Sequence, residues 1–150
     1  MRVVTTLNPA GFRASDDGHA RQQMHLHGTL DLTLPAEASS VAEARKRICE
    51  AIAPEFDGAD VDTLRLLVSE VVTNAVRHGG SSRPVEVHAT WNAEVRVEVC
   101  DQGEGFAPAP RAGALDDPGG FGLFLVGRLA DRWGVETEGG TTVWFVLRRH

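Results

Sequence analysis

The sequence lacks the cysteine pattern of a disulfide-bonded or metal-binding protein. Its two cysteines, Cys49 and Cys100, lie far apart and show no CxxC spacing, so free thiols are expected rather than a disulfide. It also has no apolar run near the roughly 20 residues that a membrane helix needs, and no signal-like N-terminus. Together these absences predict a cytoplasmic protein.

An excess of positive charge is also missing. The formal net charge is -6, whereas a protein that binds nucleic acid normally carries a concentrated basic face. The short basic run from Arg45 to Arg47 is more typical of a solvated helix face than of a contact for an acidic partner. With 150 residues, the chain has room for one ordinary core and none for a second catalytic domain.

The composition changes near residue 25. Residues 1–24 mix glycine, aspartate, arginine and glutamine without a sustained period, which predicts a flexible N-terminal arm or a loosely attached first element. From His25 to Leu34, leucines alternate with mostly polar residues, so this segment is predicted to be a strand with one buried face. We therefore expect a single domain from residue 25 to residue 150.

The rest of the chain alternates between helical and strand periods. The pattern predicts two helices at residues 37–53 and 60–78, then a hairpin of strands 85–89 and 95–99, then a long loop at 106–118. A third helix at 122–132 and a closing hairpin of strands 133–137 and 141–148 follow. This order indicates an α+β protein, a two-layer α/β sandwich with a mixed, mainly antiparallel sheet and all helices on one face.

The second predicted helix carries a polar stripe. Glu70, Asn74 and His78 recur every four residues on an otherwise apolar surface. Magnesium usually takes few protein oxygens besides substrate phosphates, and Asn74 can supply a carbonyl, while Glu70 can accept a proton from an attacking hydroxyl or water. The alternative is a solvated or locally hydrogen-bonded stripe, with His78 serving as a cap beside Gly79.

Asp101 is the informative residue of the first hairpin. Strand alternation places it on the buried face shared by Val95, Val97 and Val99, where an ionised carboxylate is costly unless a ligand or donor satisfies it. A carboxylate accepts a hydrogen bond from the amine of adenine but repels the carbonyl of guanine, so it would select ATP over GTP. Gly103 and Gly105, which follow, allow close approach to a flat base, although a plain turn is the alternative.

A second glycine cluster, Gly119 to Gly122, runs directly into the third predicted helix. Exposed backbone N–H groups at a helix N-terminus form an anion site, so phosphates would sit there. Neither cluster has the lysine of a P-loop or the spacing of a Rossmann fingerprint. We therefore predict one ATP pocket with three parts. The helix supplies a carboxylate and an amide, the strand end supplies an acid, and the second glycine cluster opens the third helix.

In this order the motifs resemble the GHKL, or Bergerat, fold, the ATP-binding domain shared by gyrase, the Hsp90 chaperone, sensor histidine kinases and MutL. The likeness covers roughly residues 25 to 148. Glu70 with Asn74 corresponds to the N-box, and Asp101 with Gly103 and Gly105 corresponds to the first glycine motif. Gly120 with Gly122 corresponds to the second glycine motif, and Gly140 with Thr141 to the terminal Gly-Thr. The resemblance implies a histidine-kinase-like ATP-binding domain with an ATP lid.

Within that family the segments EVVTNAVRHG and ADRWGV are similar to the serine/threonine-kinase anti-sigma factors and their actinobacterial relatives. Those proteins bind ATP and Mg²⁺, sequester a sigma factor and phosphorylate a serine on an anti-sigma-factor antagonist, often as homodimers. The resemblance therefore implies a regulatory kinase with a sigma factor and an antagonist as partners.

The resemblance also implies roles for single residues. Glu70 would be the general base, Asn74 the magnesium ligand and Asp101 the adenine acceptor, which Thr141 assists. Backbone amides of Gly120, Gly122 and Leu123 would contact phosphates. The nucleotide-binding set further includes His78, Gly103, Gly105 and Phe121.

One departure from the pattern keeps other functions open. Kinase members carry an arginine just before the second glycine motif, where this chain has Pro118 and Gly119, so Arg111 in the loop is the candidate replacement. A non-catalytic ATP-binding switch, whose lid reports nucleotide state to a partner, is the second reading. A detached histidine-kinase-type catalytic domain acting in trans is the third.

Overall fold

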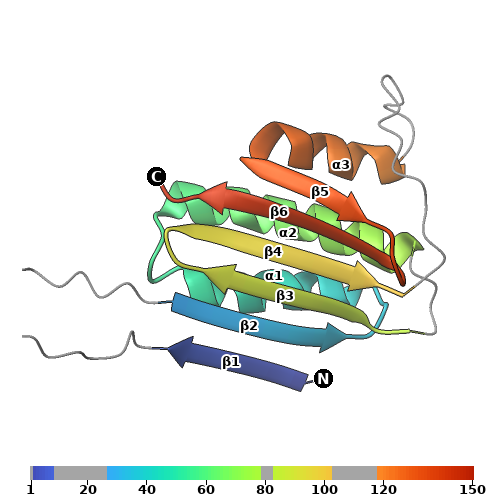
Figure 1. Ribbon diagram of the computed structural model, residues 1–150, viewed down its shortest axis with the longest axis horizontal. Helices are drawn as coiled ribbons and strands as arrows, with labels where there is room; N and C mark the ends of the chain where they lie inside the picture. Colours follow the sequence, from blue (N-terminus) through green and yellow to red (C-terminus); the bar gives the residue numbers. More distant parts are fainter. Residues whose placement is uncertain (1, 9–26, 79–82, 103–117) are drawn as a thin grey trace, which may run out of the picture.

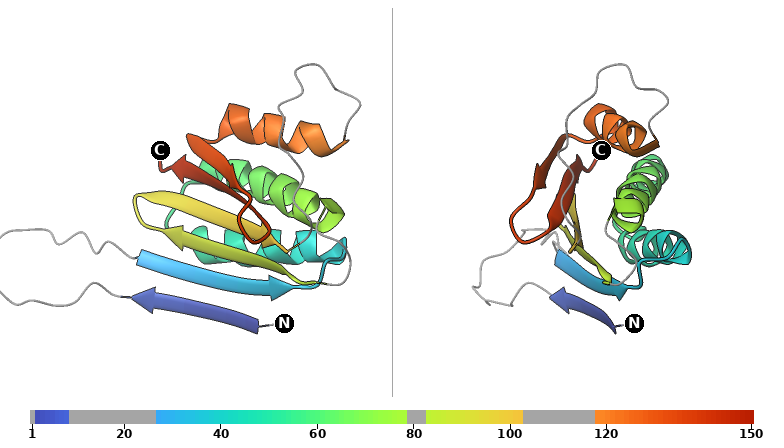
Figure 2. Two further views of the ribbon diagram at one scale, coloured as in Figure 1. Left: turned by 45° about the vertical axis from the view of Figure 1, so that its right-hand side comes forward. Right: turned by 90° about the vertical axis from the view of Figure 1, so that its right-hand side faces the viewer.

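The structure, a computed structural model, describes residues 2–8, 27–78, 83–102 and 118–150, with side chains for 28–78, 83–102 and 123–150. Three helices lie in one layer behind a single sheet (Figures 1 and 2). The helices are α1 (Ser39–Ile52), α2 (Gly58–His78) and α3 (Pro118–Leu129). The strands are β1 (Arg2–Asn8), β2 (His27–Leu34), β3 (Val85–Trp91), β4 (Glu94–Asp101), β5 (Arg132–Glu136) and β6 (Thr141–Arg148). The predicted two-layer α/β sandwich is confirmed.

The sheet has the strand order β1-β2-β3-β4-β6-β5, and every pair among these described strands is antiparallel. The sequence predicts a mixed, mainly antiparallel sheet, whereas the described strands contain no parallel pair. The reason lies in the connections. Short turns join β3 to β4 and β5 to β6, while two successive helices between β2 and β3 return the chain so that β3 runs against β2.

Strand β1 lies within residues 1–24, for which a flexible arm or a loosely attached first element was expected. Its residues pair with β2 from Arg2 opposite Thr33 to Asn8 opposite His27, so β1 is an edge strand of the sheet. The segment is rich in β-branched residues, which fit a pleated strand, but averaging over the polar residues that follow hid this preference. The remaining residues of the predicted arm lie outside the described part of the chain.

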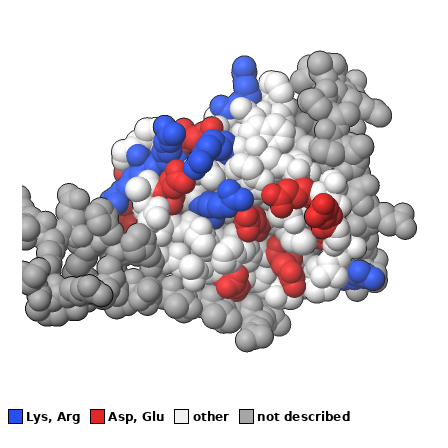
Figure 3. Space-filling view, viewed as in Figure 1, with Lys and Arg blue, Asp and Glu red and all other residues white. Residues whose placement is uncertain are grey.

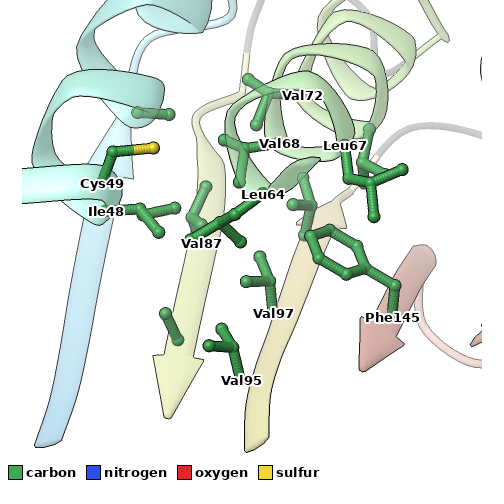
Figure 4. Packing of buried hydrophobic residues seen from close by; sticks show 14 of the residues in the cluster. Ile48, Cys49, Leu64, Leu67, Val68, Val72, Val87, Val95, Val97 and Phe145 are labelled. Atoms are coloured by element: carbon green, nitrogen blue, oxygen red, sulfur yellow. The ribbon is translucent and has the colours of Figure 1, made fainter. Parts of the chain in front are cut away.

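The core lies between the inner face of the sheet and α2. Leu64, Leu67 and Val68 of α2 point toward the strands, and Val97 and Phe145 meet them from β4 and β6 (Figure 4). All five side chains are at most 1% exposed, and complete burial of such a side chain contributes roughly 1.5–3 kcal/mol. α2 is therefore the central helix, held in place by its apolar face and flanked by α1 and α3.

The outer face of the sheet is polar and unevenly charged. Arginines gather mostly toward the end where β4 begins, and carboxylates toward the end where it finishes (Figure 3). Trp144, predicted on this face, lies there with the Arg96 guanidinium 4.3 Å from its ring centroid. A Cβ at Gly134 would lie only 2.8 Å from the Trp144 ring, so the indole lies against the β5 backbone. None of the described helices is long and apolar enough to cross a membrane.

Candidate nucleotide-binding site

Asp101 and Thr141 lie side by side at one end of the sheet. Asp101 is the last residue of β4 and Thr141 the first of β6, and they are register partners. Both side chains face the helix layer, with Asp101 5% exposed and Thr141 1% exposed. The inward orientation predicted for Asp101 is confirmed, and the partner strand adds a buried hydroxyl beside it.

A glycine turn makes this arrangement possible. Gly139 and Gly140 have φ angles of 70° and 131°, values that other residues rarely adopt. A Cβ at Gly140 would collide with the backbone carbonyl oxygen of Asp101. Only glycine therefore allows β6 to start so close to the end of β4. The motif that contains Gly140 did not predict this steric role, although a glycine pair before a strand is a signal for a tight turn.

Asn74 brings a third buried polar group from the helix layer. It is 3% exposed and lies on α2, which packs against β4 and β6. Within the described part of the chain, the buried side-chain atoms without a hydrogen-bond partner are Asn74 Nδ2 and Thr141 Oγ1. Leaving such an atom unsatisfied typically costs about 1–3 kcal/mol. Two such atoms make this end of the sheet a candidate site for a polar ligand.

The three residues of the predicted stripe on α2 differ in burial because of the helix geometry. Each step of four residues turns the helix by about 40° beyond a full rotation. Glu70 is accordingly half-buried, Asn74 is buried, and His78, the last residue of the helix, is exposed and takes part in an interaction there. The structure thus places Asn74 deepest, with Glu70 one turn before it.

The second glycine cluster lies inside α3 rather than before it. The helix begins at Pro118, four residues earlier than predicted, because proline suits a first turn whose N–H groups have no partner within the helix. The backbones of Gly120, Phe121 and Gly122 therefore belong to the first turns, where free N–H groups are found. Leu123 packs against the core.

Some predicted positions lie outside the described residues, namely Gly103, Gly105, Arg111 and the loop 106–117. At the near rim, Arg83 Nη1 donates a 3.4 Å hydrogen bond to Gln102 Oε1, which ties the start of β3 to the residue after Asp101. This contact was not predicted. No cluster of three or more His, Cys, Asp or Glu side chains suited to a metal ion occurs among the described residues.

Cys49 lies on α1, whereas Cys100 directly precedes Asp101 on β4 and has its side chain on the outer face of the sheet. Cys49 is buried in α1, and burial raises the pKa of its thiol, so the group stays protonated near neutral pH. Cys100 is partly exposed and, like Cys49, is a free thiol. The prediction of free thiols is confirmed.

This end of the sandwich has the features of a nucleotide-binding domain: buried acceptor and hydroxyl groups on adjacent strands, an amide on the central helix, and a helix N-terminus. Residues 34–147 match the family model described as the histidine kinase-like ATPase domain. The chain therefore belongs to the histidine kinase-like ATPase family. The predicted GHKL membership is confirmed.

Individual relatives are serine kinases by name. The chain is 28% identical over 134 residues to the serine-protein kinase RsbW of Staphylococcus epidermidis, covering 76% of this chain and 82% of the relative. It is 25% identical over 138 residues to the protein of the same name from Halalkalibacterium halodurans, covering 81% and 83%. The predicted likeness to serine kinases of this family is confirmed.

A solved structure shares the fold. The crystal structure of the RsbU and RsbW domains of a Mycobacterium tuberculosis protein superposes with a TM-score of 0.64 at 25% identity. The match covers 81% of this chain and 32% of that one, so this chain spans about a third of the larger protein.

Proposed function

We propose that this protein binds ATP and Mg²⁺, phosphorylates a serine of an anti-sigma-factor antagonist and sequesters a sigma factor. One observation carries the proposal. Asp101, Thr141 and Asn74 are buried at the same end of a histidine kinase-like ATPase domain, and two of them hold polar atoms without partners among the described residues. Such atoms persist where a ligand satisfies them.

The adenine end of the site is formed by the two strands. The Asp101 carboxylate would accept the hydrogen bond of the adenine amine, and the Thr141 hydroxyl can both donate and accept beside it. The close approach permitted by Gly140 sets their spacing. The roles of Gly103 and Gly105 against the base remain predictions, because both lie outside the described residues.

The phosphate end is formed by the two helices. A half-turn of the Asn74 amide exchanges its donor and acceptor atoms, so its unpaired position can present a carbonyl oxygen to Mg²⁺. Backbone N–H groups at the start of α3, from Gly120, Phe121, Gly122 and Leu123, would hold phosphate oxygens. His78 at the end of α2 is the remaining predicted contact. Bound Mg²⁺ would neutralise charge on the phosphates.

Glu70 is the proposed general base. It is half-buried on α2, one helical turn before Asn74, which is a spacing at which two helix side chains can reach a common ligand. In the transfer, the serine oxygen forms a bond to the γ-phosphorus as the bond to the β–γ bridging oxygen breaks, and Glu70 takes the hydroxyl proton. The bridging oxygen keeps the electron pair of the broken bond and leaves as part of ADP.

The outer face of the sheet supports a homodimer as part of this proposal. Arg132 and Arg148 lie toward one end and Glu86 toward the other, while Arg96 and Glu98 form an ion pair between them. A second copy related by a twofold axis would place the basic end of each face against the acidic end of the other. A cytoplasmic location and the absence of nucleic-acid binding remain predictions.

Pro118 favours a second candidate function, that of a non-catalytic ATP-binding switch. It occupies the position where the kinase pattern has an arginine, so nucleotide binding without transfer is the outcome this residue favours. A histidine-kinase-type domain acting in trans is the third candidate, and it has no specific observation in its favour.

Incubation of the protein with labelled ATP and antagonist proteins encoded near its gene tests these functions. Transfer of label to serine on one antagonist supports the kinase, and transfer to histidine supports the third candidate. ATP-dependent binding of a partner without transfer supports the switch. If the wild-type protein does not bind ATP with Mg²⁺ at all, all three are wrong.

A further inference from the structure

An aromatic surface extends from α3 to the neighbouring edge strand. The four exposed large hydrophobic side chains of the described residues include Phe124, Leu129 and Trp133, which are 56%, 41% and 38% exposed. All three fall within a stretch of ten residues, whereas the fourth, Leu66, lies alone on α2. Large apolar side chains gathered on one surface usually mark an interaction site.

The surface is continuous across two elements. Phe124 and Arg128 are one helical turn apart on α3, with the Arg128 guanidinium 5.4 Å from the Phe124 ring centroid. Between them in the sequence, a Cβ at Gly127 would lie 3.4 Å from Nε1 of Trp133, so the indole rests against this bare stretch of helix. We call these four residues, Phe124, Gly127, Arg128 and Trp133, the α3–β5 patch.

The patch has the composition of a protein interface and a charge of one sign. Phenylalanine, tryptophan and arginine are the residue types enriched in interface cores. Among the described residues Arg128 forms no ion pair, whereas the neighbouring Arg132 donates a 2.6 Å hydrogen bond to Glu94. Arg128 is thus an uncompensated cation beside exposed aromatic rings. A partner that covers the patch would complement it with a carboxylate and an apolar side chain.

The patch also lies within reach of the proposed phosphate end of the site. At 1.5 Å per residue, Phe124 is about 6 Å along the helix axis from Gly120, and Arg128 about 12 Å. A folded protein that covers the patch would span this distance easily, since one side of a typical interface buries about 800 Å². Its serine could then reach a phosphate held at the start of α3.

We propose that the α3–β5 patch is the docking surface for the protein substrate, which presents a carboxylate to Arg128 and an apolar side chain to Phe124 and Trp133. This inference rests on the proposed kinase function. It adds a surface that selects the substrate and that is separate from the nucleotide pocket. The basic run Arg45 to Arg47 on α1 is the competing contact for an acidic partner.

The test measures phosphoryl transfer to the antagonist that the wild-type protein modifies, with the variants Phe124→Ser and Arg128→Glu. Each is expected to raise KM for the antagonist about tenfold or more, since aromatic and arginine contacts carry most of the energy of an interface. The kcat at saturating antagonist and the affinity for ATP should stay unchanged. Leu66→Ser and Lys46→Glu are matched controls, an exposed leucine on α2 and an exposed lysine on α1.

A charge exchange sharpens the test. If Arg128 pairs with a carboxylate, changing that acid of the antagonist to arginine should restore a low KM with Arg128→Glu and raise it with the wild type. Circular dichroism and the midpoint of urea unfolding verify that each variant folds. Where the antagonist binds without transfer, its Kd replaces KM in every comparison.

Several outcomes would overturn the inference. Unchanged KM in both patch variants, with transfer intact in the wild type, would refute the patch while leaving the kinase function in place. The same follows if Lys46→Glu raises KM and Arg128→Glu does not, or if the patch variants change only the sedimentation of the protein alone. If the wild type neither binds nor modifies any antagonist, the proposed function fails, and the docking surface fails with it.

Discussion

The two ends of the inner sheet face are built from the same strands but serve different purposes. At one end Val95 of β4 lies opposite Leu147 of β6, and at the other Asp101 lies opposite Thr141. Around Val95 and Leu147, side chains of Phe56 and Leu64 pack so closely that no space remains for a water molecule. The first end is closed by apolar packing, and the second carries buried polar groups.

Each end also contains a buried side-chain donor, and only one of the two is satisfied. At the apolar end, Gly28 makes room for the ring of Trp91, whose Nε1 donates a 3.1 Å hydrogen bond to Glu55. At the polar end, Asn74 Nδ2 has no partner among the described residues. A protein keeps such a costly group where function requires it. The comparison indicates that one end supplies stability and the other gives up stability for binding.

The largest expected effect is on the apolar end. Leu64→Ala should lower the free energy of unfolding by about 2–5 kcal/mol, because it removes a fully buried side chain and leaves a cavity. Urea unfolding with an unchanged m-value measures this loss, and ATP affinity of the folded fraction should stay the same. A loss below about 1 kcal/mol, the range of a mild core change, would contradict the division between the ends.

At the polar end, Asp101→Asn should weaken ATP binding by about 10- to 100-fold, equivalent to the 1.5–3 kcal/mol of a hydrogen bond to a charged group. Preference for ATP over GTP should decline with it. Isothermal titration calorimetry with both nucleotides provides the measurement, and Asp62→Asn, an exposed acid on α2, is the control. Equal ATP affinity in the variant and the wild type would remove Asp101 from the site.

Asn74→Ala should lose about tenfold in ATP affinity when Mg²⁺ is present and much less when EDTA is added, since a metal contact is worth little without the metal. Glu70→Ala, one turn away, is the matched control. It should keep nucleotide binding and lose transfer to the antagonist. The assignment fails if Asn74→Ala binds ATP equally with Mg²⁺, or if Glu70→Ala retains full transfer.

Thr141→Val should have opposite effects on stability and binding. It replaces a buried hydroxyl without a partner by a methyl group of similar size, so the free energy of unfolding should rise by up to about 1 kcal/mol. ATP affinity should fall several-fold. Thermal unfolding with and without ATP measures both. A less stable variant would mean that the hydroxyl already contributes to the free protein.

The smallest effect concerns the hydrogen bonds between His150 and Asp60 at the apolar end. The His150 backbone N–H and ring Nδ1 lie 2.9 Å from the two Asp60 carboxylate oxygens. The side-chain hydrogen bond with Asp60 raises the pKa of His150 above 6.5, and the hydrogen bond from the His150 backbone lowers the pKa of Asp60 below 3.8.

The raised histidine pKa contributes stability that is present below pH 6.5 and lost as the pH rises through the folded value. The lowered Asp60 pKa contributes stability that is present above pH 3.8 and lost on further acidification. His150→Ala should therefore reduce the melting temperature slightly, most between about pH 3.8 and 6.5. A difference that is constant from pH 4 to pH 9 would show that the His150 ring does not titrate against Asp60.

Most elements of the fold were predictable because their periods are local. The helical spacing of α2 and the alternation in β3 and β4 each place apolar residues on one face. For residues 1–24 the sequence left a flexible arm and a loosely attached first element open, because a seven-residue strand gains its stability from pairing with β2, and residues 9–26 separate the two strands in the sequence. The start of α3 was placed too late because glycines were interpreted as a loop before the helix.

The sequence alone determined the two-layer fold, the family and the inward orientation of Asp101, since period and motif order are local properties of the chain. Only the tertiary structure decided three further features. Asp101 and Thr141, forty residues apart, become neighbours because β4 pairs with β6. Gly140 is required because two backbones meet there. Phe124 and Trp133 form one surface because a glycine on α3 lets the edge strand come close. Each depends on how separate helices and strands pack against one another, which no local pattern records.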